Sequence, residues 1–258
     1  MAPRLYLIGR PVFDRHHHAF LDDFLPADDR LWKVNNTATP AERLVEFAGR
    51  VCYMSFGSRQ SAKTNAEYIA NLIGKGHESV LEHAVWTIAV SGMSRAFTHQ
   101  LVRHRVGFSV SQLSQQYHDE TEARFIRPAG IDQHPDAAAV WDKAIRGSQT
   151  AYRKLLKELV TSTALPSGSP QEHMRALRSA ARSVLPNATE TALVVTANAR
   201  SVRYFLKVRG NIKGDVEMRC FAAALLELIR PEGPSLFSDF YVEHLEDGLP
   251  VVVHRPTA

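Results

Sequence analysis

The chain alternates between stretches whose apolar residues recur every three or four positions and short runs that are apolar throughout. The first spacing is typical of a helix with one buried face. In the clearest case the apolar positions are Leu44, Val45, Phe47, Ala48 and Val51. Residues 39–42 (TPAE) precede them with a capping threonine, a proline for the first helical position and a glutamate that can reach back. A helix therefore begins there, and residues 64–67 (TNAE) predict a second helix that ends near Gly74.

The same criteria predict the remaining elements. We expect helices at residues 94–103, 136–159, 170–185, 199–208 and 216–229. Apolar, β-rich runs indicate strands at residues 4–9, 86–90 and 191–196, and residues 241–253 form a terminal hairpin around Asp247-Gly248. Residues 11–39 are expected to be irregular, and a Ser/Gly/Pro-rich loop is expected at residues 166–170. The pattern is that of a mixed α/β (α+β mixed) protein.

Composition limits the class of protein. Of the 258 residues, 45% are apolar and 22% charged, which is typical of a globular chain with ample material for a core. The net charge of +4 suits an anionic partner but is far from the charge density of a nucleic-acid-binding tail. Cys52 and Cys220 give no metal-binding spacing. Because residues 1–10 lack an apolar core and no run could span a bilayer, we expect a cytoplasmic protein without a membrane partner.

Positive charge gathers between residues 95 and 105. Arg95, His99 and Arg103 are spaced four apart, so a helix would stack them on one face, and His104 and Arg105 follow. Like charges so placed repel, and an anion lying across them would relieve the repulsion. A Ser/Gln-rich continuation to residue 116 offers neutral hydrogen-bonding groups. The set suits a phosphorylated small molecule with a hydrogen-bonding ring, although a solvated basic face followed by a polar loop explains it equally well.

Further arginines recur downstream, where Arg175, Arg178 and Arg182 share a helical spacing. Arg178 and Arg182 could instead be ordinary salt-bridged surface residues. Residues 198–200 (NAR) stand where a predicted strand enters a helix, and free backbone amides at such a point attract anions. Residues 15–18 (RHHH) could bind a metal ion, but a solvated loop is the preferred interpretation.

Several of these segments together resemble the flavin-dependent thymidylate synthase (ThyX) family. The family's Arg-His-Arg signature corresponds to residues 103–105, and its serine to Ser114. The other matching segments are residues 45–50 (VEFAGR), 52–53 (CY), 77–83 (HESVLEH) and 181–186 (ARSVLP), together with Asn198, Arg200 and Arg209. Each match alone is weak, but the ordered set is specific.

The resemblance implies a single ThyX-like domain over residues 1–258, with a central mixed sheet flanked by helices. It also implies a homotetramer with active sites at subunit interfaces, and FAD, NADPH and methylenetetrahydrofolate as cofactors. By the resemblance, FAD would contact Ser79, Glu82, Arg103, His104, Arg105, Asn198 and Arg200. The nucleotide would be held by Arg95, Gln100, Gln112, Ser114, Gln116, Arg182 and Arg209, of which Arg209, Ser114 and Arg182 would act in catalysis. Ser79 and Glu82 could instead form a purely structural capping box.

The expected chemistry needs no cysteine nucleophile. Both cysteines stand at apolar helix ends and are expected to be buried packing residues. Polarisation of the uracil ring by a guanidinium, that of Arg209 by analogy, would then make its C5 carbon reactive.

The chain departs from the family pattern at three positions. Eight residues rather than seven separate the Arg-His-Arg signature from Ser114, and Gly107 allows an altered backbone path. Gln116 replaces a substrate-binding arginine, and Tyr204 replaces a histidine or asparagine. These departures leave open C5 methylation of dUMP, methylation of the ribonucleotide UMP in nucleoside-antibiotic biosynthesis, and a flavin- and nucleotide-binding protein without turnover. An RNA-binding module would also explain the basic helix, but the arginines are not interleaved with a stripe of aromatic residues.

Overall fold

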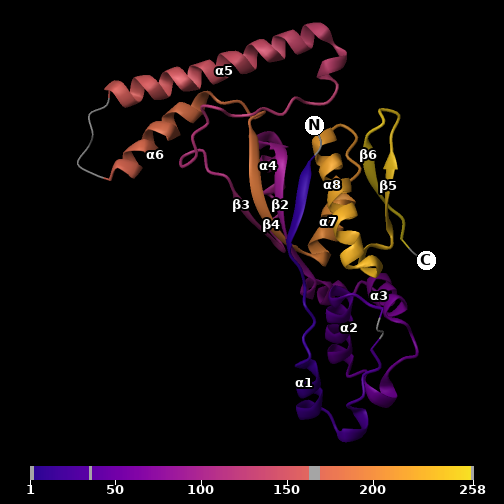
Figure 1. Cartoon of the computed structure of the whole chain (residues 1–258). Coiled ribbons are helices and arrows are strands. Elements are labelled where there is room, and N and C mark those ends of the chain that lie inside the picture. The colour runs from indigo at the N-terminus through magenta and orange to yellow at the C-terminus, as the bar shows by residue number, and fades with distance from the viewer. Residues whose placement is uncertain (1–2, 35–36, 163–168, 257–258) are drawn as a thin grey trace. The chain divides into compact units, whose positions relative to one another are not determined.

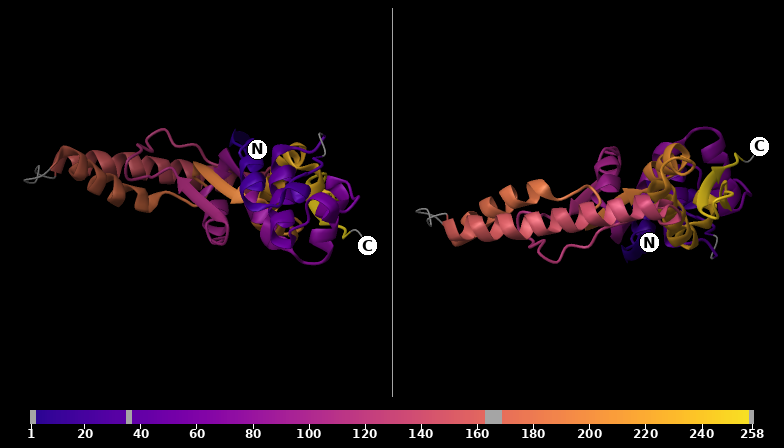
Figure 2. Two further views of the ribbon diagram at one scale, coloured as in Figure 1. Left: turned by 90° about the horizontal axis from the view of Figure 1, so that it is seen from below. Right: turned by 90° about the horizontal axis from the view of Figure 1, so that it is seen from above.

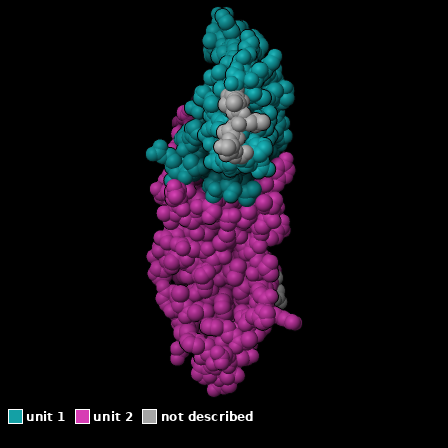
Figure 3. Space-filling view, turned by 90° about the vertical axis from the view of Figure 1, so that its left-hand side faces the viewer, with its two compact units in different colours: residues 1–4, 90–103, 110–194 teal, residues 5–89, 104–109, 195–258 magenta. Residues whose placement is uncertain are grey.

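The computed structural model describes residues 3–34, 37–162 and 169–256. Its backbone contacts divide the chain into two compact units (Figure 3). Unit 1 comprises Met1–Arg4, Val90–Arg103 and Val110–Val194, and unit 2 comprises Leu5–Ala89, His104–Ser109 and Val195–Ala258. The expectation of one domain stays a prediction. The predicted loop at residues 166–170 lies mostly outside the described residues.

The larger sheet has four strands in the order β1-β2-β4-β3 (Figure 1). The strands are β1 (Arg4–Gly9), β2 (Val85–Ser94), β3 (Phe108–Gln112) and β4 (Glu190–Asn198). The Arg95 amide, just after β2, donates to the carbonyl of Thr189, just before β4. The Ala199 amide, just after β4, donates to the carbonyl of Ala84, just before β2. The central pair β2 and β4 is therefore antiparallel, a pairing that a mixed sheet also contains, so the expectation of a mixed sheet stays a prediction.

The described part of unit 1 carries three α-helices, α4 (Arg95–Leu101), α5 (Pro135–Ser162) and α6 (Pro170–Ala181). α5 and α6 lie side by side in the views of Figures 1 and 2. Tyr152 and Leu156 of α5 pack against Leu177 and Ala181 of α6 in a small apolar core. The predicted helix at residues 170–185 is shorter than expected, because its last turn is a 3-10 helix at Arg182–Val184.

Unit 2 contains the other helices and a two-stranded antiparallel sheet. The α-helices are α1 (His17–Phe24), α2 (Pro40–Tyr53), α3 (Asn65–Gly74), α7 (Ala199–Arg209) and α8 (Val216–Ile229). The hairpin pairs β5 (Phe240–His244) with β6 (Pro250–His254), as predicted. The 3-10 helices of the described chain are Ala27–Asp29, Gly57–Arg59, η3 (Glu78–His83), Ile131–Gln133, Arg182–Val184, Arg230–Glu232 and Pro234–Phe237.

The predicted capping signals are confirmed. The side chains of Thr39 and Thr64 each accept a hydrogen bond from the backbone of a glutamate three residues later, whose carboxylate returns to the cap. Such caps typically stabilise a helix by about 1 kcal/mol. α2 and α3 therefore begin at the residues that the sequence predicted.

The region around the histidine run was predicted wrongly. Residues 17–24 form α1 rather than an irregular loop, and Leu21 anchors this helix in an apolar cluster with Trp32 and Phe56. His17 packs against the rings of Phe13 and Trp32 instead of lying free in solvent. Among the described residues, no group of histidine, cysteine or carboxylate side chains could hold a metal ion.

Candidate functional site

Arg95 is the first residue of α4, which begins at the cap formed by the Ser94 hydroxyl. Its Nη2 donates to the carbonyl oxygen of Leu113 at 2.8 Å, while its buried Nε has no partner in the described structure. Burial lowers the pKa of Arg95, and the positive charge of Arg182 lowers it further, whereas Glu120 opposes this effect. The like charges of Arg95 and Arg182 thus act on each other, and the carboxylate of Glu120 offsets them only in part. This arrangement favours the binding of an anion.

The helix that carries Arg95 ends sooner than predicted. α4 stops at Leu101, so Arg103 does not share a helical face with Arg95 and His99. His99 and Arg103 are both exposed. The described residues contain no carboxylate within ion-pair distance of Arg103 or of Arg182, whose side chain is partly buried where α6 ends.

The Ser/Gln-rich segment after α4 contains strand β3, which the polar composition of the sequence concealed. Gln112 ends this strand, and its Nε2 donates to the Thr98 hydroxyl at 3.1 Å. The Ser114 hydroxyl accepts a hydrogen bond from the backbone amide of Gln116. Gln100 lies on α4 in the same unit and is partly buried. Unit 1 therefore contains all the expected nucleotide contacts except Arg209.

The Gln116 side chain is held by α6. Its Nε2 donates to the Ser179 hydroxyl at 3.3 Å, and its Oε1 accepts from Arg175 Nε at 3.2 Å. Arg175 also makes two hydrogen bonds of 3.0 Å to the carboxylate of Glu172. The neutral residue at this position is thus already hydrogen-bonded to an arginine. Arg178, by contrast, is partly buried and pairs with Asp119, so it is salt-bridged, as one of the two interpretations of the sequence allowed.

The expected flavin contacts, apart from Arg103, lie in unit 2. Glu82, in η3, accepts a hydrogen bond of 2.6 Å from Arg200 at the start of α7. Ser79 is exposed in the same 3-10 helix. η3 has no side-chain cap, so the alternative that Ser79 and Glu82 form a capping box is wrong. This segment brings a hydroxyl, a carboxylate and a guanidinium together at one end of α7.

Asn198 caps α7 by accepting a hydrogen bond from the Ser201 amide at 2.9 Å. The Ala199 amide is used as well, because it donates to the carbonyl of Ala84. The Asn198 amide donates to the carbonyl of Gly107, whose φ is +69°. A Cβ at Gly107 would lie 2.0 Å from the Ser201 hydroxyl and 2.6 Å from Asn198 Nδ2. Gly107 thus has a left-handed backbone conformation and packs directly against the start of α7, while an altered path relative to the family stays a prediction.

His104 and Arg209 form a second contact in unit 2. Arg209 Nε donates to His104 Nε2 at 3.2 Å, so the histidine must be the neutral tautomer with its proton on Nδ1. Burial lowers the pKa of His104, and the neighbouring charge of Arg209 lowers it further. Arg105 is exposed, and so is Tyr204 on α7.

The two cysteines differ from the expectation that both are buried. Cys52 is exposed, because the last turn of α2 leaves it on the outer side of the helix. Cys220, on α8, is partly buried, and burial raises the pKa of its thiol. A raised pKa leaves little thiolate at neutral pH and makes Cys220 a poor nucleophile.

Glu120 is a site residue that the sequence did not reveal. It is only 3% exposed, and its carboxylate opposes the fall in the pKa of Arg95. In the sequence it belongs to the segment DETE at residues 119–122, which reads as a solvated acidic turn. Only the fold shows that one of these carboxylates turns inward, and burial raises its pKa.

The fold and these clusters define a mixed α/β protein with two sets of arginine side chains suited to anionic ligands. Residues 33–235 match the family model described as "Thymidylate synthase complementing protein". A flavin-dependent thymidylate synthase of Mycobacteroides abscessus is 41% identical over 232 residues, which cover 90% of this chain and 91% of that protein. That of Mycobacterium avium is 42% identical over 230 residues, covering 89% and 90%. The chain belongs to the flavin-dependent thymidylate synthase family, which confirms the resemblance seen in its motifs. No described helix is long and apolar enough to cross a membrane.

Proposed function

We propose that this protein methylates C5 of dUMP to form dTMP, with methylenetetrahydrofolate as the carbon donor and NADPH-reduced FAD as the source of the hydride. The observation that carries this proposal in the structure is the partly buried Arg95, whose pKa is lowered by burial and lowered further by the nearby positive charge of Arg182. A phosphorylated nucleotide would relieve that repulsion through charge-assisted hydrogen bonds. The names of the relatives supply the reaction class.

The residues of unit 2 fit a flavin dinucleotide by the chemistry of their donors. Arg105 and Arg200 offer guanidinium groups for a diphosphate, and Ser79 and Asn198 offer a hydroxyl and an amide. When bound, FAD supplies hydride chemistry that no side chain can perform. Arg103 and His104, with Glu82, complete the set proposed to hold it.

The protein's own part in the reaction is to bind the uracil nucleotide and polarise its ring. Arg209 is proposed to stabilise negative charge that builds on the ring oxygens, and neutral His104 holds its guanidinium in place. Ser114, Gln112 and Gln100 would supply neutral hydrogen bonds to the nucleotide. Cys220, with its raised pKa, is not needed as a nucleophile.

The proposal is tested by supplying purified protein with FAD, NADPH, methylenetetrahydrofolate and dUMP. We expect a yellow protein with a flavin absorption band, and dTMP as a product identified by mass spectrometry. A protein that takes up FAD but forms no methylated nucleotide from dUMP or UMP would instead be a binding protein without turnover. A colourless protein that takes up no FAD would refute the flavoenzyme and favour a binding module.

Methylation of UMP is the second candidate, because the residue at position 116 is a neutral amide. The neutral side chain and its partner Arg175 replace the arginine that the family pattern places there. An amide can both donate to and accept from a 2′-hydroxyl, whereas a guanidinium can only donate. Parallel turnover assays with dUMP and UMP decide between the two substrates. A homotetramer with interfacial active sites is part of the same proposal.

A further inference from the structure

A pocket of about 230 Å³ opens in unit 2 between the end of α2, α3 and the residues before η3. Its lining includes Tyr53, Ser55, Arg59, Tyr68, Lys75 and His77. No residue of the lining is an aspartate or a glutamate. None of the nucleotide or flavin contacts expected from the family motifs lies in it.

The pocket wall holds two buried hydroxyl groups, those of Tyr68 and Ser55, which interact with each other. Tyr68 is only 7% exposed, and neither its hydroxyl oxygen nor the Ser55 hydroxyl has a partner of good geometry among the described residues. Burial raises the pKa of Tyr68, so its phenol stays protonated and can donate. A hydroxyl can both donate and accept, so this pair keeps hydrogen-bonding capacity for a group that enters the pocket.

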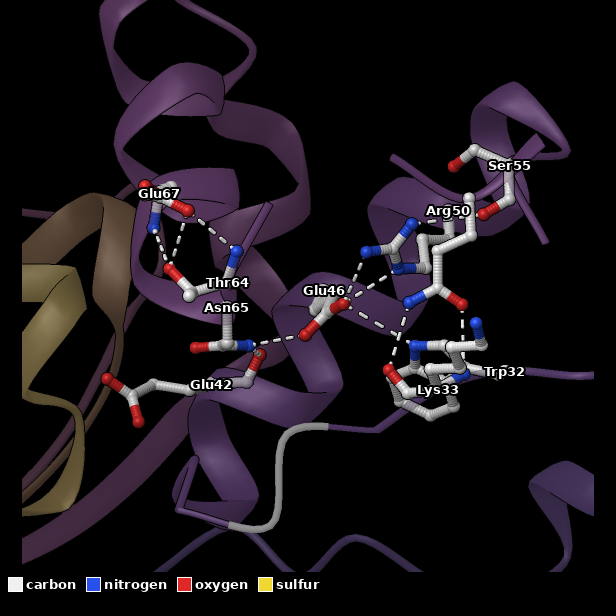
Figure 4. Close-up of polar contacts among 10 residues, drawn as sticks. Trp32, Lys33, Glu42, Glu46, Arg50, Ser55, Thr64, Asn65 and Glu67 are labelled. Atoms are coloured by element: carbon white, nitrogen blue, oxygen red, sulfur yellow. Dashed lines mark hydrogen bonds and ion pairs between the residues drawn. The ribbon is translucent and has the colours of Figure 1, made fainter. Parts of the chain in front are cut away.

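The charge behind this wall is already neutralised. Arg50 is fully buried, its guanidinium lies 4.6 Å from the centre of the Tyr68 ring, and Glu46 pairs with it at 2.7 Å. Figure 4 shows Arg50 between Glu46 and the carbonyl oxygen of Ser55, which accepts a hydrogen bond of 3.0 Å. This network fixes the positions of Ser55 and Tyr68, but it does not give the pocket a net charge.

The positive charge of the pocket comes from Arg59 and Lys75, which are both exposed. The described residues hold no carboxylate within ion-pair distance of either side chain. Tyr53 and His77 add a further polar group, because the phenol oxygen lies 2.8 Å from His77 Nδ1. Two unneutralised cations beside hydroxyl donors are the groups that bind a phosphate monoester or a carboxylate.

We propose that this pocket binds the terminal anionic group of an elongated co-substrate of the reaction. The inference rests on the proposed function, because His77 is two residues before Ser79, a proposed flavin contact. Their α-carbons are thus at most about 7 Å apart. A co-substrate that reacts at the flavin could extend its far end into the pocket. Two sources share this chemistry, namely the 2′-phosphate of NADPH and the glutamate carboxylates of the folate.

Binding of paired probes to the full-length protein separates the two sources. Isothermal titration compares 2′,5′-ADP with 5′-AMP, and pentaglutamylated with monoglutamylated tetrahydrofolate. We expect the more anionic member of one pair to bind at least about 10-fold more tightly, the effect of a charge-assisted hydrogen bond. Arg59→Gln and Lys75→Gln should remove that preference. Tyr68→Phe keeps the ring over Arg50 and should weaken the same probe.

Lys63→Gln is the matched control, because Lys63 is an exposed lysine before α3 that does not line the pocket. It should leave the preference unchanged. The inference is overturned if neither pair of probes is distinguished, or if the control lowers the preference as much as the pocket variants do. Formation of dTMP by the wild-type protein is measured alongside. If the wild-type protein forms dTMP but distinguishes neither pair of probes, the pocket proposal is refuted and the proposed function is not.

Discussion

The contact between His104 and Arg209 links a histidine of the Arg-His-Arg signature to the last residue of α7. A protonated imidazole could not accept this hydrogen bond, because both of its nitrogens would carry protons. Burial and the charge of Arg209 both lower the pKa of His104, so the accepting form is the stable one at neutral pH. The histidine therefore positions a guanidinium without competing with it for an anion.

This contact predicts a pH dependence of stability. The unfolded chain has an ordinary histidine pKa of about 6.5 and binds a proton before folded His104 does. The contribution of His104 to stability is thus fully present above about pH 6.5. It is lost as the pH drops towards the lowered pKa of the folded state. We expect wild type to lose up to about 1 kcal/mol more than His104→Gln between pH 7.5 and 5.5. Urea unfolding of both proteins measures this, and equal losses would contradict it.

Replacement of Arg209 by alanine or by lysine tests separately whether its positive charge and its guanidinium geometry are needed for methylation. Arg209→Ala should fold and keep FAD but lose methylation, because the ring loses its cationic partner. Arg209→Lys restores the charge without the planar fork or the Nε donor to His104, so it should recover only part of the activity. We expect kcat to fall about 100-fold or more in the alanine variant, in line with the loss of a single transition-state donor. Full turnover would remove Arg209 from the mechanism.

Gln116 is the residue at which the nucleotide preference can be tested. Gln116→Arg introduces a guanidinium next to Arg175, which would lose its hydrogen bond to the amide. We expect the ratio of dUMP to UMP turnover to rise, because the substituted position restores the family's cation and removes the neutral hydrogen-bonding group. Ser179→Ala removes only the other partner of Gln116 and serves as the control. An unchanged ratio would show that Gln116 does not set specificity.

At the scale of an element, Gly107 of the signature loop packs against the start of α7. Gly107→Ala would adopt a left-handed φ of +69° and place its Cβ 2.9 Å from Ser201 Cβ. Gly76→Ala is a matched control, since its φ is +71° and nothing lies within 4 Å of the added carbon. The backbone term costs about 1–2 kcal/mol in both variants. The crowding at residue 107 should cost another 1–3 kcal/mol or so, measured by denaturant unfolding.

The elements that the sequence predicted share a local signal. α2 and α3 combine an apolar period with a capping box, and α8 begins and ends at the predicted residues because Asp215 caps it and Pro231 follows it. Their boundaries are encoded within a few residues. The sequence alone is sufficient in such cases.

The elements that were missed depend on distant partners. Strand β3 reads as polar loop, and it is a strand because β4 pairs with it. α1 begins in a run of histidines, and its place is set by the contact of Leu21 with Trp32 and Phe56. η3 has no side-chain cap at all. Non-local pairing and packing of this kind leave no periodic trace in the sequence.

The sequence predicted those residues of the candidate site that belong to recognisable motifs. The motifs named Arg95, Arg182, His104 and Arg209, but they could not show which groups neutralise or orient these side chains. Burial of Glu120 and the bond between Arg175 and Gln116 follow from packing that no spacing reveals. The roles of the site residues stay predictions.

Across the whole molecule, the arginines with a structural role are paired with carboxylates, and those proposed to bind ligands are not. Arg50, Arg203 and Arg219 are fully or almost fully buried, and each is paired with a carboxylate. Removing one partner of such a pair typically costs 3–5 kcal/mol or so, because it leaves a buried charge. Arg103, Arg105 and Arg182 lie nearer the surface, and the described residues give them no carboxylate partner. Charge left unneutralised in a folded protein is available to a ligand.

The proposed assembly predicts that inactive variants can complement one another. Arg182 belongs to unit 1 and Arg209 to unit 2, and active sites at subunit interfaces would take the two arginines from different chains. Arg182→Ala and Arg209→Ala should each be inactive alone. After dissociation and random reassembly, about a quarter of the sites would contain both native arginines if each comes from a different subunit. We therefore expect dTMP formation to return to roughly that fraction of the wild-type rate. If one chain supplies both arginines, every site lacks one of them and the mixture stays inactive, while size-exclusion chromatography with light scattering reports whether the mixed protein is a tetramer.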